Sequence, residues 1–108
     1  MNDNVTKDIL NVYSILAERY EIIINDYKDD FISYDKYTSK EHILNMLKSF
    51  SRNDKDLTID KASRSFGYIQ GILACQGVID IEYERNHTRP FFQLVYTTHN
   101  IKQQTINF

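Results

Sequence analysis

The sequence predicts an all-α protein, a compact bundle of four or five short helices in one domain over residues 1–108, with a polar C-terminal tail from about residue 102. Glycine and proline are scarce, with three Gly and one Pro, whereas small all-β domains need many turns and usually more of both. Apolar residues recur at intervals of three and four, which is the spacing of one helix face. The hydrophobic fraction of 42% is too high for a disordered chain.

The first predicted helix covers residues 4–27. Asn4 is a suitable N-cap, and Asp8 lies near the positive end of the helix dipole. We expect one face of this helix to pack into the core, because its apolar residues follow the helical period. These residues are Val5, Ile9, Val12, Leu16, Tyr20, Ile23 and Tyr27.

The segment over residues 26–37 reads DYKDDFISYDKY and mixes aspartates with aromatic residues. It predicts a loop or a short irregular turn. One interpretation is a solvated connector whose rings are held by the core. The other is an acidic-aromatic patch for a basic protein partner, since aromatic residues are enriched at interfaces. The candidate partner-binding residues are Asp26, Tyr27, Asp29, Asp30, Tyr34, Asp35 and Tyr37.

A second helix is predicted to begin at Thr38-Ser-Lys-Glu41, which matches a capping box with a hydroxyl N-cap and a glutamate three residues later. The helix continues to about Arg52, and a polar loop follows over residues 53–56. Its apolar face consists of Ile43, Leu44, Met46, Leu47 and Phe50.

A third helix is predicted over residues 58–76, with Gly77 as the left-handed residue after its end. Gly67 and Gly71 lie four residues apart within it, and they predict close approach of another helix or, alternatively, of a ligand. Cys75 lies in the same apolar helix and is expected to be a buried, unreactive thiol. The apolar face consists of Ile59, Ala62, Phe66, Ile69 and Leu73.

The last segment, residues 78–100, fits two structures. Its alternation of apolar and polar residues on either side of a bend fits two strands. It also fits helices, with Asp80 as an N-cap and with Thr88 capping a second helix that has Pro90 in its first turn. We expect helices, and a C-terminal β-hairpin would instead make the chain an α+β winged helix.

One stretch of the chain contains Arg64-Ser-Phe-Gly67-Tyr-Ile-Gln70-Gly71, followed by Gly77-Val-Ile-Asp80 and by residues 84–91. This stretch resembles a group of small phage-encoded accessory proteins of unknown function. The resemblance covers residues 58–96. It implies a phage accessory protein with a helical last segment that works in the cytoplasm of the host cell. Proteins of this class often serve host takeover or counter-defence.

The same region also resembles winged-helix regulators similar to the multiple-antibiotic-resistance repressor type. Gly77-Val-Ile79 would be the turn after the recognition helix, residues 81–85 and 91–97 the strands of a hairpin, and residues 86–90 its tip. This resemblance implies a protein that binds nucleic acid with Arg64 and Arg89.

A second candidate binding site lies in the third and fourth segments. In one interpretation it is a structural network, in which an arginine pairs with Glu84 and ties the fourth segment to the third. In the other it binds an anion or an acidic partner, because arginine forks grip phosphate and carboxylate, and His87 would make that binding pH-sensitive. The residues are Arg64, Gln70, Glu84, Arg85, His87 and Arg89.

Enzyme signatures are missing from the sequence. It has no Gly-rich phosphate loop, no His-Glu-x-x-His motif and no cysteine pair for zinc. The three histidines and the single cysteine also lack metal-ligand spacing. We therefore predict no catalytic residue, no metal site and no cofactor.

These observations favour a small non-enzymatic binding protein that regulates or inhibits a host macromolecule, with a host protein as partner. Two alternatives stay open, a winged-helix nucleic-acid-binding regulator and a protein that sequesters a small ligand such as a nucleotide. The net charge of −2 lacks the basic footprint that nucleic acid usually requires. No apolar run approaches the roughly 20 residues that cross a bilayer, so no membrane contact is expected. The single cysteine fits a reducing cytoplasm, and the modest core leaves a homo-oligomer open.

Overall fold

The structure is a computed structural model that describes residues 3–50 and 56–100. It contains the helices α1 (Asp3–Asp26), α2 (Lys40–Ser49), α3 (Ile59–Cys75) and α4 (Ile81–Thr98), with a short 3-10 helix η1 (Lys36–Thr38) before α2. No strand occurs in these residues, so the all-α prediction is confirmed. The predicted tail over residues 102–108 and all but the last residue of the predicted loop over residues 53–56 lie outside the described ranges.

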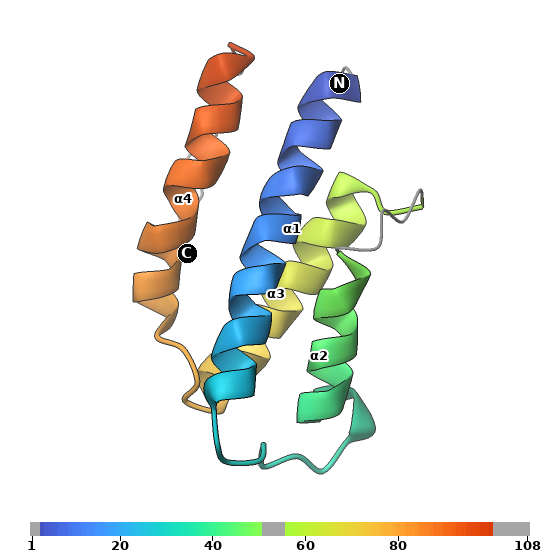
Figure 1. Cartoon of the computed structure of the whole chain (residues 1–108), viewed down its shortest axis with the longest axis vertical. Coiled ribbons are helices and arrows are strands. Elements are labelled where there is room, and N and C mark those ends of the chain that lie inside the picture. Colours follow the sequence, from blue (N-terminus) through green and yellow to red (C-terminus); the bar gives the residue numbers. More distant parts are fainter. Residues whose placement is uncertain (1–2, 51–55, 101–108) are drawn as a thin grey trace.

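Helices α2, α3 and α4 are arranged around α1, which packs against each of them. In Figure 1, α2 and α3 lie on one side of α1 or behind it, and α4 lies on the other side. α1 and α4 run antiparallel along their length (Figure 1). α4 is therefore joined to the rest of the bundle mainly through α1.

The core forms where α1, α2 and α3 meet. The predicted face of α1 is confirmed at its buried positions Val5, Ile9, Val12, Leu16 and Tyr20. The rings of Tyr20 and Phe66 stack with centroids 5.2 Å apart, which joins α1 to α3. The buried residues that face α1 are Ile43, Leu47, Phe50, Ala62, Phe66, Ile69 and Leu73.

The ends of α2 and α3 follow local capping rules. The N-cap of α2 is Ser39, whose hydroxyl accepts from the His42 N–H, so the predicted start at Thr38 is wrong by one residue because η1 takes up Thr38. Thr58, the predicted first residue of α3, is its N-cap, and its side chain accepts from the Lys61 N–H. The end of α3 is a Schellman motif, in which Val78 N–H donates to the Leu73 carbonyl and Gly77 has a φ of +74°.

Two expectations about α3 are wrong. Gly67 and Gly71 are exposed, and a Cβ built on either would meet no atom within 4 Å, so no other helix of the described residues approaches them closely. Cys75 is exposed rather than buried. The helical period explains this, since a residue two positions after the buried Leu73 is turned about 200° away from the core.

α4 is one continuous helix. The sequence of residues 78–100 predicts two helices or, alternatively, a hairpin, so both interpretations are wrong in this respect. Asp80 is its N-cap, as expected, and accepts from the Tyr83 N–H at 2.8 Å. Thr88 caps nothing and is buried within the helix. Pro90 lies in the interior of α4, where the missing N–H and the steric clash cost about 3 kcal/mol. The strands proposed at residues 81–85 and 91–97 are therefore wrong.

Candidate protein-docking surface

The connection between α1 and α2 carries the first of two groups of exposed apolar side chains. Ile32 is 78% exposed and the Tyr34 ring is fully exposed. Tyr37 is also exposed, and so is Tyr68 of α3, whose hydroxyl donates to the Tyr37 carbonyl at 2.7 Å. We call Ile32, Tyr34, Tyr37 and Tyr68 the loop surface.

The backbone that leads into Ile32 is anchored to the core and to α2. Phe31 is buried in the core, and its ring lies edge-on to that of Tyr27 with centroids 6.1 Å apart. The ammonium of Lys40 donates to the carbonyls of Tyr27 and Asp29, at 2.6 and 3.2 Å. With Phe31 held inside, the next side chain, Ile32, points outward.

Gln76, the C-cap residue of α3, clamps the same loop. Its side-chain oxygen accepts from the Ile32 N–H at 2.9 Å, and its side-chain nitrogen donates to the Ile32 carbonyl at 2.7 Å. One amide thus satisfies both backbone groups of Ile32, as a neighbouring strand would. The loop is held in one shape although it contains no strand.

The predicted acidic-aromatic residues surround this surface. Asp26, Asp29, Asp30 and Asp35 are all exposed. Asp35 also caps η1 by accepting from the Tyr37 N–H at 2.8 Å. Tyr27 differs from the prediction, because it is half-buried and its hydroxyl donates to the Gln76 carbonyl at 3.5 Å.

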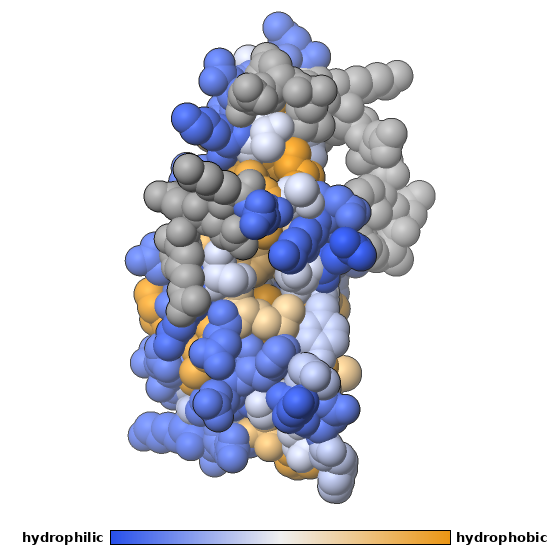
Figure 2. All heavy atoms as spheres, turned by 90° about the vertical axis from the view of Figure 1, so that its right-hand side faces the viewer, coloured by the Kyte–Doolittle hydropathy of each residue, from blue (hydrophilic) through white to orange (hydrophobic). Residues whose placement is uncertain are grey.

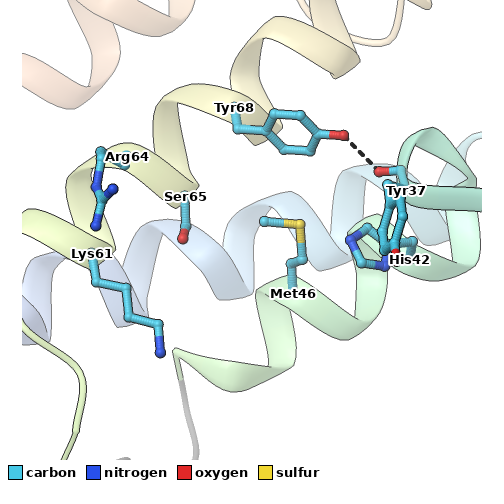
Figure 3. A pocket seen from close by; sticks show the side chains of 7 residues that line it. All are labelled: Tyr37, His42, Met46, Lys61, Arg64, Ser65 and Tyr68. Carbon is cyan, nitrogen blue, oxygen red and sulfur yellow. Dashed lines mark hydrogen bonds between the residues drawn. The ribbon is translucent and has the colours of Figure 1, made fainter.

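A shallow, open groove of about 440 Å³ adjoins the loop surface between α2 and α3 (Figure 3). Lys61, Arg64 and Ser65 of α3 line one end. At the other end the rings of Tyr37 and His42 meet edge to face, with centroids 5.3 Å apart. Figure 2 shows the side of the molecule that carries α2, where a narrow hydrophobic band lies between hydrophilic side chains. The remaining lining residues are Met46 and Tyr68.

The second candidate site does not come together as one cluster. Arg64 is exposed and pairs within its own helix with Asp60 at 3.1 Å. Arg89 is exposed as well, and Arg85 is half-buried. The His87 ring stacks on Tyr83 with centroids 6.1 Å apart.

Glu84 and Gln70 instead contact two neighbouring residues of α1. Both carboxylate oxygens of the buried Glu84 pair with the guanidinium of Arg19, the Nη2–Oε2 distance being 3.1 Å. Gln70 donates to the Tyr20 hydroxyl at 2.9 Å. This arrangement is the structural network considered above, but it ties α4 to α1 and uses an arginine that the sequence had not singled out. Arg19 is 65 positions away from Glu84, so no local spacing reveals the pair.

Burial controls the two most perturbed phenols of the protein. Desolvation raises the pKa of Tyr20 well above its usual value, and the hydrogen bond from Gln70 offsets part of that rise. Desolvation also raises the pKa of Tyr13, against a hydrogen bond with Ser63. Both phenols therefore stay protonated to a higher pH than an exposed tyrosine does.

No family model, curated protein or solved structure matches this chain. Within residues 3–50 and 56–100, no group of three His, Cys, Asp or Glu side chains is placed to hold a metal ion. None of the helices described has the length and apolar character to span a membrane.

Proposed function

We propose that this chain is a non-enzymatic binding protein that regulates or inhibits a macromolecule by docking a basic protein partner on the loop surface. The observation that supports this best is the clamped loop, which holds Ile32 and Tyr34 in solvent. Exposing an isoleucine and a tyrosine on a fixed backbone has no benefit for the isolated fold, since their burial is what would stabilise it.

A fixed loop favours tight binding for an entropic reason. A flexible segment loses backbone and side-chain freedom when it binds, and that loss subtracts from the affinity. Here the contacts of Gln76, Lys40 and Phe31 already restrict the loop when the protein folds. Less conformational freedom is therefore left to lose when the partner binds. The partner then meets an apolar centre that is already in place.

The charge around the surface indicates the chemistry of the partner. Residues 26–37 contain four aspartates against two lysines, Lys28 and Lys36. The Lys36 ammonium lies over the Tyr37 ring, 4.9 Å from its centroid. An apolar centre with aspartates along the loop complements a partner whose apolar side chains adjoin a basic edge, and the charges raise the rate of encounter. The resemblance to phage accessory proteins adds that the partner is a host protein.

The experiment is capture of a partner from host-cell lysate by the tagged chain, compared with its own variants. We expect Ile32→Ser and Tyr34→Ser to lose the captured protein, because each removes an apolar contact at the centre. Tyr34→Phe keeps the ring and is the matched control. All three changes lie at exposed side chains, so helicity measured by circular dichroism should stay constant. Capture that is equal for the wild type, Ile32→Ser and Tyr34→Ser would refute the proposal.

The groove supports a second candidate, a small anionic ligand such as a nucleotide. Lys61 and Arg64 at one end could pair with a phosphate, and Tyr37 at the other offers an aromatic face. This candidate predicts that a nucleotide raises the melting temperature of the wild type and not of Arg64→Met. A melting temperature that no nucleotide changes would exclude it.

A further inference from the structure

A second group of exposed apolar side chains lies on α1 and α4, away from the loop surface. Five exposed apolar residues and the half-buried His87 form it, and we call them the helix strip: Ile15, Ile22, Tyr83, His87, Phe91 and Leu94. Leu94 is 69% and Tyr83 is 62% exposed, and both isoleucines are exposed as well. The strip goes beyond the proposed function, since neither the loop surface nor the groove contains any of these residues.

The residues of α4 in the strip lie on one flank of the helix. Tyr83, His87, Phe91 and Leu94 are spaced by four, four and three positions, which keeps them on one side. The rings of Tyr83, His87 and Phe91 follow one another along the helix, with centroids 6.1 Å apart from Tyr83 to His87 and 5.9 Å apart from His87 to Phe91. The residues of α4 that pack against the core, such as Tyr96, lie on the other flank.

The residues of α1 in the strip lie beside that flank. Two residues of α1 reach across to α4, where Asp8 contacts His99 and Arg19 contacts Glu84. Ile15 and Ile22 follow the same side of α1, since Ile15 is seven positions after Asp8 and Ile22 is three after Arg19. Because the two helices are antiparallel (Figure 1), these cross-contacts place Ile22 near the level of Tyr83 and Ile15 near that of Phe91. The two helices therefore present one continuous apolar face.

α4 buries few residues fully within the single chain, although the half-buried Phe92 and Tyr96 pack against the core. Only Glu84, Thr88 and Val95 are buried among its 18 residues, and two of these three are polar. α2, with 10 residues, buries Ile43 and Leu47 completely. A helix derives most of its stability from burying an apolar face, and α4 also carries Pro90 in its interior. The strip is the apolar face that α4 has left to bury.

We infer that the helix strip is the interface of a symmetric dimer, with the strip of a second copy as its occupant. The exposed parts of six large side chains of about 200 Å² each amount to roughly 500–600 Å² per copy, and flanking residues extend this toward the roughly 800 Å² of a standard interface. The flank of α4 beside the strip is uncharged, with Asn86, Pro90, Gln93 and Thr97. A two-fold axis places identical surfaces together, and an apolar strip on an antiparallel helix pair complements itself. In this dimer, α1 and α4 of one copy pack against α1 and α4 of the other and form a four-helix bundle.

The experiment is sedimentation equilibrium of the full chain over about 1–300 µM, a range in which a specific dimer shows mass action. We expect the wild type to approach twice the monomer mass of 12.8 kDa. Leu94→Glu and Tyr83→Glu should raise the dimer dissociation constant by at least about tenfold, because each buries a charge between the copies. Ile32→Glu is the matched control, since it places the same charge on an exposed apolar residue of the loop surface and should leave the dimer intact. Circular dichroism of each variant checks that its helices are retained.

Each other outcome overturns the inference. A wild type that remains monomeric throughout this range has no such interface. A dimer that survives both strip substitutions, or that Ile32→Glu dissociates, uses another surface. A monomeric wild type whose captured partner is lost on Leu94→Glu assigns the strip to that partner. Lysate capture with loop variants tests the proposed function separately, so either idea can fail while the other stands.

Discussion

Breaking the buried ion pair between Arg19 and Glu84 should destabilise this fold far more than breaking the exposed pair of Arg64 with Asp60. The Arg19 side chain is 27% exposed and the Glu84 side chain only 3%. The second pair, Arg64 with Asp60, is 74% and 80% exposed and lies within one helix. The two pairs use the same groups at very different depths, so they form an internal comparison.

The perturbation is Arg19→Met, which keeps a long apolar side chain and removes the charge. It leaves the carboxylate of Glu84 buried without its partner, and such a change costs about 3–5 kcal/mol. The remaining exposure of Arg19 lets water reach part of the site, so we expect about 3 kcal/mol. Against a total stability of about 5–15 kcal/mol for a small domain, this is a large fraction. Arg64→Met should cost less than about 1 kcal/mol, since exposed pairs contribute little.

The assay is urea unfolding followed by circular dichroism at one fixed protein concentration, with the midpoint and slope compared between variants. The double variant Arg19→Met/Glu84→Leu should recover much of the loss, because it leaves no unpaired buried charge. If Arg19→Met and Arg64→Met have equally small effects, the Arg19–Glu84 pair does not hold α4 against α1. If the double variant is less stable than either single one, the loss is one of packing rather than of charge pairing.

Two further predictions follow from backbone conformation and from burial. Gly71→Ala should stabilise the protein by about 0.5–1 kcal/mol, because Gly71 lies in a helix with no atom within 4 Å of a new Cβ. Gly77→Ala should instead destabilise the protein by about 1–2 kcal/mol, because the φ of Gly77 is +74° and a Cβ is strained there. Urea midpoints that shift in the same direction for both glycine variants would contradict this. Because burial raises the pKa of Tyr20, the unfolded state loses this proton near pH 10 while the folded state retains it. The contribution of Tyr20 to the free energy of unfolding should therefore be fully present below about pH 10 and decrease above it. Unfolding curves between about pH 8 and 11 should show a smaller decrease for Tyr20→Phe than for the wild type. Equal decreases in the two proteins would mean that Tyr20 ionises readily in the folded state.

Helices α1, α2 and α3 could be predicted from the sequence because each has a strong local signal. The apolar period along α1 names its buried residues from Val5 to Tyr20, and Thr58 and Gly77 mark both ends of α3. The period alone would also have placed Cys75 outside the core. Gly67 and Gly71 misled the prediction, since a glycine in a helix has no side chain to show which neighbour, if any, it faces.

α4 was harder to predict because its local signals conflict. Its alternating residues fit a strand, Pro90 suggests a break, and the stabilising contact of Glu84 is to a residue far away in the sequence. The candidate site shows the same limit. The composition of residues 26–37 indicated the acidic-aromatic character of the loop, but the clamp from Gln76 spans 44 positions and has no local pattern. Long-range polar contacts therefore account for most of what sequence periodicity missed.

The distribution of polar and apolar residues on α4 depends on which side of α1 this helix contacts. The apolar face of α1 is occupied by α2 and α3, so α4 meets the flank that carries Asp8 and Arg19. Two polar contacts join α4 to this flank, and Val95, Phe92 and Tyr96 pack against the core. The other large apolar side chains of α4 turn away from the core. A helix packed only for a monomer would reverse this, with Tyr83 and Leu94 inside and Glu84 outside. A seam within the chain that mixes polar pairs with a few apolar contacts, and a largely apolar strip outside it, are the distribution expected of a helix with a second face to bury against another molecule.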